Sequence, residues 1–284
     1  MNCRYCKDTG KYKQPNDVER FERLIDIEME KAYFVNYEIA EEKAYNAVGY
    51  TVIDCPYCAN NEKTMIFQDK YKLTPEESAF LAKKKWDENV YCGMRMENRA
   101  VTFPQTKTIL NGVNVANVHL DDIQAILNMR DAWKYLMQTI DAPLDLDYIC
   151  KLNEFIARNE ALEWGTLRKG SVGISGTDYI PPIPEKNAVE SGLAAILGGN
   201  TTATEKALNA FVWGARGQFF WDGNKRTSLT VANKILLMNG AGIMTITDNQ
   251  MERFNELLVE YYNTGKPEQL KQFLYENAIQ GIEK

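Results

Sequence analysis

One segment of the chain gathers residue types that can bind phosphate. It reads QFFWDGNKRT over residues 218–227 and runs directly into an apolar helical stretch. A turn at Gly223 would feed into the helix N-terminus, where unpaired backbone N–H groups and the helix dipole favour an anion. Lys225 and Arg226 add cationic donors, and arginine can hold a phosphate through two parallel hydrogen bonds. Asp222 supplies a hard oxygen ligand that suits Mg²⁺.

Together with Asn224, which can orient the loop, these residues predict a site for a nucleotide di- or triphosphate with magnesium. The alternative is an Asp-Gly turn that only starts a helix and leaves Lys225 and Arg226 solvated. The sequence carries no Walker or Rossmann glycine pattern that would compete for the nucleotide. A nucleotide with Mg²⁺ is therefore the expected ligand of this loop.

Four cysteines form a second group with the spacing of metal ligands. Cys3 and Cys6 make one C-x-x-C pair, and Cys55 and Cys58 make another. Each pair can place two sulfurs on one side of a zinc ion, and four thiolates close a tetrahedral structural site. The sequence therefore predicts structural Zn²⁺, and two unrelated pairs of buried thiols are the alternative.

The remaining cysteines and the single histidine have plainer expected roles. Cys92 and Cys150 lie in apolar helical surroundings and are expected to be core thiols. His119 stands at the start of a predicted helix, far in sequence from the glycine-containing loop. We expect this histidine to be structural, which leaves the loop without an obvious imidazole base.

The elements that must hold these residues follow from apolar spacing and capping signals. Helices are expected from Val18 to Met29 and over residues 36–48, followed by an extended run over 50–53. From Thr74 onward helix follows helix, and Thr74 and Thr102 each begin a capping box with proline in the first turn. The prediction is a small zinc-binding α+β module over residues 1–68 and a mainly α domain over 69–284.

Composition limits the possible partners. The chain has 284 residues, a formal net charge of −6 and a pI near 5.1, so nucleic acid is not an expected partner. No stretch approaches the roughly 20 apolar residues of a membrane span, and the N-terminus lacks the pattern of a signal peptide. The expected location is cytoplasmic, with no membrane partner.

The loop resembles the signature of the Fic/Doc (Fido) family, H-x-F-x-D/E-G-N-G/K-R. The matching positions are Phe220, Asp222, Gly223, Asn224, Lys225 and Arg226. The resemblance covers residues 70–284 and leaves the cysteine module outside. It implies a Fic-fold helical bundle with a small β-hairpin flap. It also implies transfer of AMP from ATP to a Ser, Thr or Tyr hydroxyl of a target protein, with the motif histidine as general base.

Two further segments are similar to parts of the same family. Residues 164–168 and 173–182 resemble the flap, which implies that a target segment docks along residues 172–180 by main-chain hydrogen bonds. The docking residues expected there are Gly173, Ile174, Gly176, Thr177, Asp178 and Tyr179. A hairpin that simply covers the core is the alternative.

Residues 95–98 are similar to the inhibitory-helix pattern S/T-x-x-x-E-G/N, with Gly93 where Ser or Thr is expected. This resemblance implies an inhibitory role for Glu97. The alternative is a solvated or helix-capping glutamate.

Two positions depart from the family pattern. Gln218 stands where the family has its histidine, and an amide cannot accept the proton of a target hydroxyl, although it can hydrogen-bond to it. Loss of a general base costs about 10²- to 10⁴-fold in rate. Leu229 stands where a longer form of the signature has a second arginine, which pairs with the inhibitory glutamate. The sequence thus predicts an ATP-binding Fic-fold protein with weak or lost transfer. The alternative is a non-catalytic module that binds a protein partner through its zinc ribbon and flap.

Overall fold

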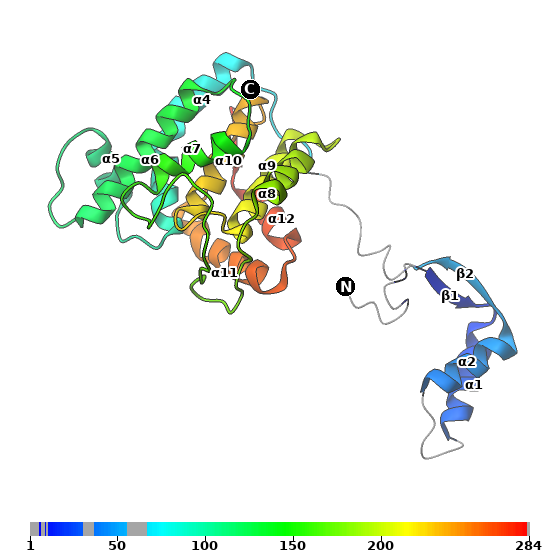
Figure 1. The fold of residues 1–284 in the computed structure, drawn as a ribbon. Coiled ribbons are helices and arrows are strands. Elements are labelled where there is room, and N and C mark those ends of the chain that lie inside the picture. Colours follow the sequence, from blue (N-terminus) through cyan, green and yellow to red (C-terminus); the bar gives the residue numbers. More distant parts are fainter. Residues whose placement is uncertain (1–5, 7–8, 10, 31–36, 56–66, 283–284) are drawn as a thin grey trace. The chain divides into compact units, whose positions relative to one another are not determined.

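The chain divides into two compact units, Met1–Met65 and Ile66–Lys284. The structure is a computed structural model that describes residues 6, 9, 11–30, 37–55 and 67–282. Each unit has its own helices and strands (Figure 1). Each also has its own buried apolar core. The predicted boundary after residue 68 lies close to this division.

The smaller unit combines two helices with a two-stranded antiparallel sheet. Strand β1 (Lys11–Pro15) pairs with β2 (Tyr50–Asp54) in a register that sets Lys11 opposite Asp54. Helices α1 (Val18–Glu30) and α2 (Tyr37–Val48) lie between the strands in the chain and pack against each other. The order is therefore β-α-α-β, which confirms the predicted α+β character.

A small apolar core joins the two helices of this unit. Phe21 and Ile25 from α1 bury their side chains with Ala40 and Ala44 from α2. Gly49 ends α2 at a φ of 71°, a backbone conformation that glycine adopts without strain. Val18 and Met29, which stand near the two ends of α1, are exposed.

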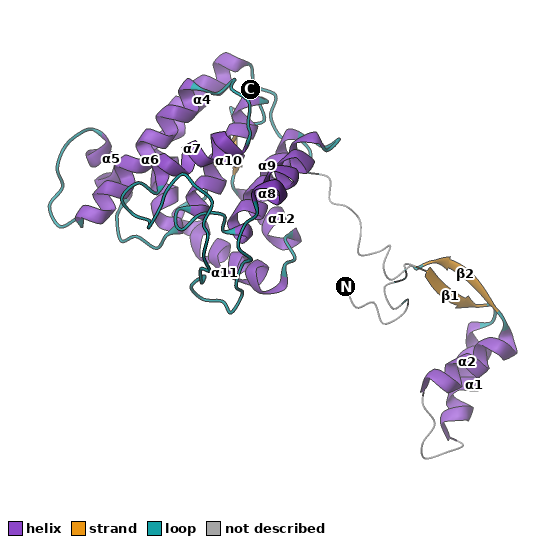
Figure 2. Cartoon of the chain, in the orientation of Figure 1, coloured by secondary structure: helices purple, strands orange, loops and turns teal. Residues whose placement is uncertain are grey.

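The larger unit is mainly helical (Figure 2). Its helices are α4 (Pro75–Met96), α5 (Phe103–Leu110), α6 (Leu120–Gln138), α7 (Leu146–Ile156), α8 (Lys186–Gly198), α9 (Ala203–Gly217), α10 (Asn224–Met238), α11 (Asp248–Thr264) and α12 (Glu268–Asn277). Two short strands, β3 (Ile243–Met244) and β4 (Ile279–Gln280), pair antiparallel near its C-terminus.

Helix α10 forms the centre of this unit. It packs against α9 along most of its length and also against α4, α7 and α6, so nearly every residue from Asn224 to Leu237 is buried. Each of its buried polar side chains makes at least one hydrogen bond. Lys234, for example, donates to the carbonyls of Thr139 and Ile140 at the end of α6. A helix enclosed by its neighbours holds its N-terminus in one place, and that is where the segment 218–223 leads into it.

The predicted helix starts at Thr74 and Thr102 are confirmed. Each threonine hydroxyl accepts from the backbone N–H three residues later, and Glu77 or Gln105 reaches back to the threonine N–H. These reciprocal bonds satisfy two of the donors that every helix start leaves open. The caps fix where α4 begins, and its far end reaches the candidate site.

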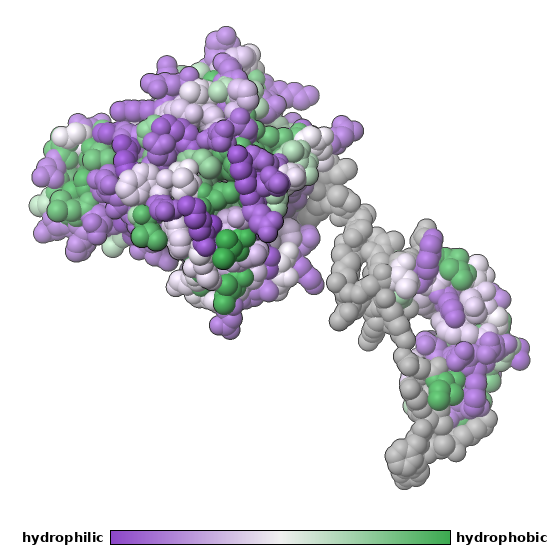
Figure 3. All heavy atoms as spheres, in the orientation of Figure 1, coloured by the Kyte–Doolittle hydropathy of each residue, from purple (hydrophilic) through white to green (hydrophobic). Residues whose placement is uncertain are grey.

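The surface of the larger unit is mostly polar on the face that Figure 3 shows, with apolar residues in scattered patches. Among the exposed large apolar side chains are Leu120, Leu162 and Ile180. Within the described parts of the chain, no helix has both the length and the apolar content needed to cross a bilayer.

Candidate functional site

The segment QFFWDGNKRT forms the tight connection between α9 and α10. Gln218 caps the C-terminus of α9 in the left-handed region, with φ 45° and ψ 56°. Gly223 caps the N-terminus of α10 at φ 72°. A Cβ on Gly223 would come within 2.9 Å of the Ile156 side chain, so the turn needs glycine both for its backbone angle and for its close approach to α7.

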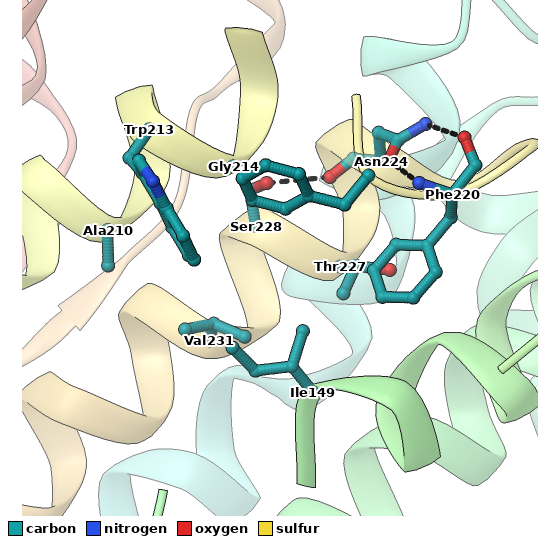
Figure 4. A pocket seen from close by; sticks show the side chains of 10 residues that line it. Ile149, Ala210, Trp213, Gly214, Phe220, Asn224, Thr227, Ser228 and Val231 are labelled. Atoms are coloured by element: carbon teal, nitrogen blue, oxygen red, sulfur yellow. Dashed lines mark hydrogen bonds between the residues drawn. The ribbon is translucent and has the colours of Figure 1, made fainter. Parts of the chain in front are cut away.

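Asn224 holds this loop in shape from inside. Its Oδ1 accepts from the Phe220 N–H at 2.9 Å, and its Nδ2 donates to the Phe220 carbonyl at 2.8 Å (Figure 4). The same Nδ2 donates to the side-chain oxygen of Gln218 at 3.0 Å. The predicted orienting role of Asn224 therefore has a geometric basis, since one buried side chain joins both ends of the loop.

The Gln218 side chain is turned into the loop. Its Nε2 donates to the carbonyl of Ala215 in the last turn of α9 at 2.7 Å, while its Oε1 accepts from Asn224. Both ends of the amide are thus engaged with the chain's own groups. The backbone carbonyl of Gln218 also accepts from Arg168 Nε. In this arrangement Gln218 stabilises the loop.

Arg226 lies in the first turn of α10 and is only 1% exposed. Its Nη1 donates to Glu160 Oε1 at 3.1 Å and to the Ile156 carbonyl at 3.3 Å. Its Nη2 lies 3.7 Å from Asp222 Oδ1 and its Nε 3.8 Å from Glu97 Oε1. Burial opposes the charged form, but Glu97 and Glu160 outweigh it and raise the pKa of Arg226.

The Nε of Arg226 has no hydrogen-bond partner among the described residues, although it is fully buried. A buried donor of an arginine that lacks such a partner costs free energy unless a ligand or water completes it. This edge of the guanidinium faces Glu97 and Asp222. This edge therefore holds a donor that is unused among the described residues.

Lys225 connects the start of α10 to the end of α4. Its Nζ donates to the Met96 carbonyl at 2.5 Å and lies 3.3 Å from Glu97 Oε2. Glu97 is the C-cap residue of α4, and its side chain is 20% exposed. The fold therefore brings Glu97 to Lys225 and Arg226, which lie 128 and 129 positions further along the sequence.

Asp222 is the most exposed charged group of the loop, with its side chain 44% accessible. Its Oδ1 accepts from the N–H of Gly223, and its backbone carbonyl accepts from Asn153 Nδ2 at 3.0 Å. An exposed carboxylate on a fixed backbone, next to cationic donors, fits the preference of Mg²⁺ for one protein carboxylate plus phosphate oxygens. The residues present are compatible with a magnesium nucleotide.

A narrow, mostly apolar pocket lies on the inner side of the loop (Figure 4). The side chains of Phe219 and Trp213 meet there, with ring centroids 4.5 Å apart. Ile149 from α7 and Val231 from α10 also line the pocket. These contacts anchor the aromatic residues of the loop between three helices.

Comparison with known proteins agrees with this architecture. Residues 143–236, from the start of α7 through most of α10, match the family model described as Fic/DOC family. This is a Fic fold. No curated protein sequence matches the chain significantly.

Solved structures with the Fic fold align over much of the chain at low sequence identity. A Fic family protein from Desulfovibrio desulfuricans gives a TM-score of 0.57 at 17% identity, over 69% of this chain and 64% of that one. A Fic domain containing signaling protein from Bacteroides thetaiotaomicron gives 0.56 at 20% identity, over 72% and 85%. Fic-1 from C. elegans gives 0.60 at 14% identity, over 92% and 79%. The chain thus spans less than two thirds of the Desulfovibrio protein.

The flap segment departs from the expected hairpin. Residues 166–185 contain no strand and form an irregular loop that turns at Ser175 and Gly176, where φ is 84°. Arg168 is 1% exposed and donates to the carbonyls of Gly170, Pro181 and Pro182. The predicted β-hairpin is therefore wrong. Prolines lack the N–H that a ladder needs, and the buried arginine ties the two arms together in its place.

The predicted docking residues of the flap lie on this loop and not on a strand. Gly173, Gly176 and Asp178 are exposed, whereas Ile174, Thr177 and Tyr179 are partly buried. Thr177 Oγ1 bonds to Asn263 on α11, and the Tyr179 ring lies 3.8 Å from the Arg216 guanidinium. The flap is therefore anchored to α9 and α11 near the site.

Leu229, in the position of the second arginine of the longer signature, is fully buried in the main core of the Fic-fold unit. It lies one helical turn beyond Arg226 and faces inward. With leucine at position 229, the cationic partners of Glu97 are Lys225 at 3.3 Å and Arg226 at 3.8 Å.

Two residues with buried side chains near the loop, Asn153 and Glu160, were not predicted as site residues. Asn153 on α7 donates to the Asp222 carbonyl and to Thr227 Oγ1, and Glu160 pairs with both Arg226 and Arg99. Their partners are 61 to 74 positions away in sequence. No local pattern in a single sequence signals such pairings.

The predicted zinc ligands are only partly described. Cys6 and Cys55 are buried, and they lie just outside β1 and β2 at the end of the ladder where Lys11 faces Asp54. Thr9 closes a turn by donating to the Cys6 carbonyl through both N–H and hydroxyl. Cys3 and Cys58 lie outside the described residues, so the zinc site stays a prediction.

The other thiols and the histidine are not part of the loop segment 218–227. Cys92 is buried, its sulfur accepts from the Ile246 N–H, and burial raises its pKa to about 12. Cys150 is partly buried, which raises its pKa to about 11. Both stay protonated near neutral pH. His119 is the exposed N-cap residue of α6 and makes no side-chain capping bond.

Proposed function

We propose that the Fic-fold unit binds ATP with Mg²⁺ through the loop Asp222–Arg226, and that it transfers AMP to protein hydroxyls slowly or not at all. The observation that carries this proposal is the buried Arg226 guanidinium. Its Nε lacks a hydrogen-bond partner among the described residues, and the Nε and Nη2 edge faces Glu97 and Asp222. An anion there would complete the hydrogen bonds of Arg226 and meet the positive end of the helix dipole.

The groups around this edge suit a triphosphate. Gly223 allows the backbone to approach closely, the first N–H groups of α10 point out of the helix, and Arg226 can contact a phosphate through two donors. Lys225 lies beside them as a further cation. When bound with the nucleotide, Mg²⁺ would neutralise phosphate charge, and Asp222 is the carboxylate placed to hold it.

In this proposal Glu97 has an inhibitory role. Its carboxylate pairs with Lys225 and approaches Arg226 at the edge that we assign to phosphate. A carboxylate and a phosphate cannot share the same donors, so the nucleotide must displace Glu97. Glu97 then lowers the affinity for ATP without taking part in transfer.

Gln218 supports the proposal of weak or absent transfer. An amide has no proton-accepting nitrogen near neutral pH, and here its two polar atoms are engaged with Ala215 and Asn224. Positioning and charge stabilisation by the remaining loop can still contribute to phosphoryl-type transfer. The flap backbone over residues 172–180, which is partly exposed, is the proposed contact for a protein target.

A non-catalytic protein-binding module is the second candidate, and the pairing of Glu97 with Lys225 favours it. In this state the loop satisfies its own charges without a ligand. The zinc ribbon and the flap would then be the surfaces that bind a partner protein. The two candidates differ in whether the loop binds nucleotide.

Calorimetric titration of the full chain with ATP, in the presence and absence of Mg²⁺, separates the two candidates. We expect saturable binding that Mg²⁺ strengthens and that Lys225→Ala weakens by about tenfold, a typical loss for one partly buried cation. Lys84→Ala removes an exposed lysine of α4 well upstream of Glu97 and is the matched control. Absence of ATP binding at millimolar concentration would favour the protein-binding module.

We also propose that the smaller unit holds structural zinc through Cys3, Cys6, Cys55 and Cys58. The buried positions of Cys6 and Cys55 at one end of the β1–β2 ladder support this assignment. Elemental analysis of protein purified without chelator should give one zinc per chain, and Cys55→Ser should abolish it. A zinc content near zero in the unaltered chain would refute the assignment.

A further inference from the structure

Glu160 is a buried carboxylate that contacts the candidate site from behind. It follows α7 after a turn in which Asn159 adopts a φ of 62°, and its side chain is 6% exposed. Its Oε1 accepts from Arg226 Nη1 at 3.1 Å and from Asn128 Nδ2 at 2.8 Å, and its Oε2 pairs with Arg99 at 2.5 Å. Three donors from three parts of the chain therefore fix this carboxylate.

The partners of Glu160 are themselves held in place. Arg99 also pairs with Asp122 at 2.9 Å, and Asn128 also donates to the Arg158 carbonyl at 2.8 Å. Asn128 is 1% exposed and lies on α6, a helix that packs against α7 and α10. A carboxylate embedded in such a network has little freedom to move. It can therefore define the orientation of a flexible side chain that bonds to it.

Arg226 is that flexible side chain. Its Nη1 is engaged by Glu160 and by the Ile156 carbonyl. With this corner fixed, the planar guanidinium presents Nε and Nη2 on the opposite side, toward Glu97 and Asp222. These two nitrogens form the edge that can bind a phosphate through parallel hydrogen bonds.

We propose that Glu160 is a positioning residue, which holds the Arg226 guanidinium with its Nε and Nη2 edge directed at the nucleotide phosphates. The inference rests on the proposed function, because it assigns a role to Glu160 in the same site. Fixing the guanidinium before binding lowers the entropy lost when the phosphate is engaged. The negative charge of Glu160 also stabilises the positive charge of this buried arginine.

A double-mutant cycle on the full chain tests this proposal through Mg²⁺–ATP affinity. Glu160→Ala is measured with arginine at position 226 and again with Arg226→Lys, which keeps a charge but lacks the planar edge. We expect Glu160→Ala to weaken ATP binding by about tenfold with arginine present and by less than about twofold with lysine present. Glu160→Gln, which keeps an acceptor oxygen for Arg226, should recover part of the lost affinity.

Asp122→Asn is the matched control. It removes an ion-pair partner from Arg99 but does not touch Arg226. It should lower thermal stability in the manner of the Glu160 variants and leave ATP affinity within about twofold of the unaltered chain. Equal losses of affinity from Glu160→Ala in both backgrounds, or a similar loss from Asp122→Asn, would show that Glu160 acts only on stability.

ATP binding by the unaltered chain distinguishes a failure of the proposed function from a failure of the role of Glu160. If the unaltered chain does not bind ATP, the proposed function fails and the role of Glu160 fails with it. If it binds ATP and the cycle shows no coupling, only the role of Glu160 fails. Should Glu160→Ala not fold, the same cycle with the near-isosteric Glu160→Gln decides.

Discussion

The two ends of the loop between α9 and α10 differ in charge and in how their side chains are engaged. At the α10 end, Lys225 and Arg226 lie among carboxylates, and one edge of Arg226 lacks a hydrogen-bond partner among the described residues. At the α9 end, Gln218 is neutral, and both polar atoms of its side chain form hydrogen bonds with neighbouring groups. The cationic groups that can bind a phosphate are therefore at one end of this short loop. The position of the group that would accept a proton is at the other end.

Because the two ends differ in this way, we expect Gln218→His to cause the largest change, an increase in AMP transfer. Histidine tolerates the left-handed backbone of position 218, and an imidazole there can accept a hydroxyl proton. AMP transfer from α-labelled ATP to proteins of a lysate, or to the chain itself, should rise by about 10²- to 10⁴-fold over the unaltered chain. Gln218→Asn, which has no titrating nitrogen, is the control and should show no gain. A histidine variant that stays silent while binding ATP normally would mean that the loop lacks more than its base.

Removal of Arg226 should have the next largest effect, on binding. Arg226→Ala deletes the edge that we assign to phosphate and should weaken ATP by about 100-fold, the loss expected for a bidentate buried contact. Calorimetry measures this directly. Gln218→Asn should change ATP affinity by less than about threefold, because the amide belongs to the other end of the loop. Similar losses of ATP affinity from Arg226→Ala and Gln218→Asn would show that the two ends of the loop do not differ in phosphate binding.

Gly223→Ala should distort the turn on which the α10 end depends. The added Cβ meets the Ile156 side chain at 2.9 Å, and the left-handed backbone at φ 72° costs about 1–2 kcal/mol for a residue with a Cβ. Thermal unfolding of the full chain should show a lower Tm, by about 2–4 °C per kcal/mol for a unit of this size. Gly112→Ala is a fair comparison, since that position also has a positive φ but its Cβ would meet nothing within 4 Å. A greater drop for Gly112→Ala would contradict the role of the contact with α7.

The smallest effect, of opposite sign, is expected for Glu97. Glu97→Gln removes the carboxylate charge that faces Lys225 and Arg226 and should tighten ATP binding by about three- to tenfold. Glu88→Gln alters another glutamate of the same α4 segment, paired with Lys85 away from the loop, and should leave the affinity unchanged. Unchanged or weaker binding by Glu97→Gln would remove Glu97 from any inhibitory role.

The sequence predicted the parts of the molecule that depend on neighbouring residues. The capping boxes at Thr74 and Thr102 and the loop that runs into α10 are local patterns, and the structure has all three. The helix and strand signals of the smaller unit are also local, although β1 was missed because KYKQP has no alternation of apolar residues.

The parts that the sequence did not predict depend on distant residues. Glu160 is found only through its contacts with Arg226 and Arg99, which lie 66 and 61 positions away. The flap carries a family-like pattern, but Arg168 joins its arms through side-chain bonds and no strand forms. Such long-range bonds are decided by packing and leave no signature in local spacing.

The central claim is that the α10 end of the loop binds the phosphates of ATP, and a crystal structure with a non-hydrolysable ATP analogue and Mg²⁺ tests it most directly. We predict phosphate oxygens within hydrogen-bonding distance of Arg226 Nε or Nη2 and of the first backbone N–H groups of α10, with Glu97 moved off Lys225. Phosphates bound elsewhere on the chain, or a Glu97 that stays paired with Lys225 while the nucleotide is bound, would contradict the claim.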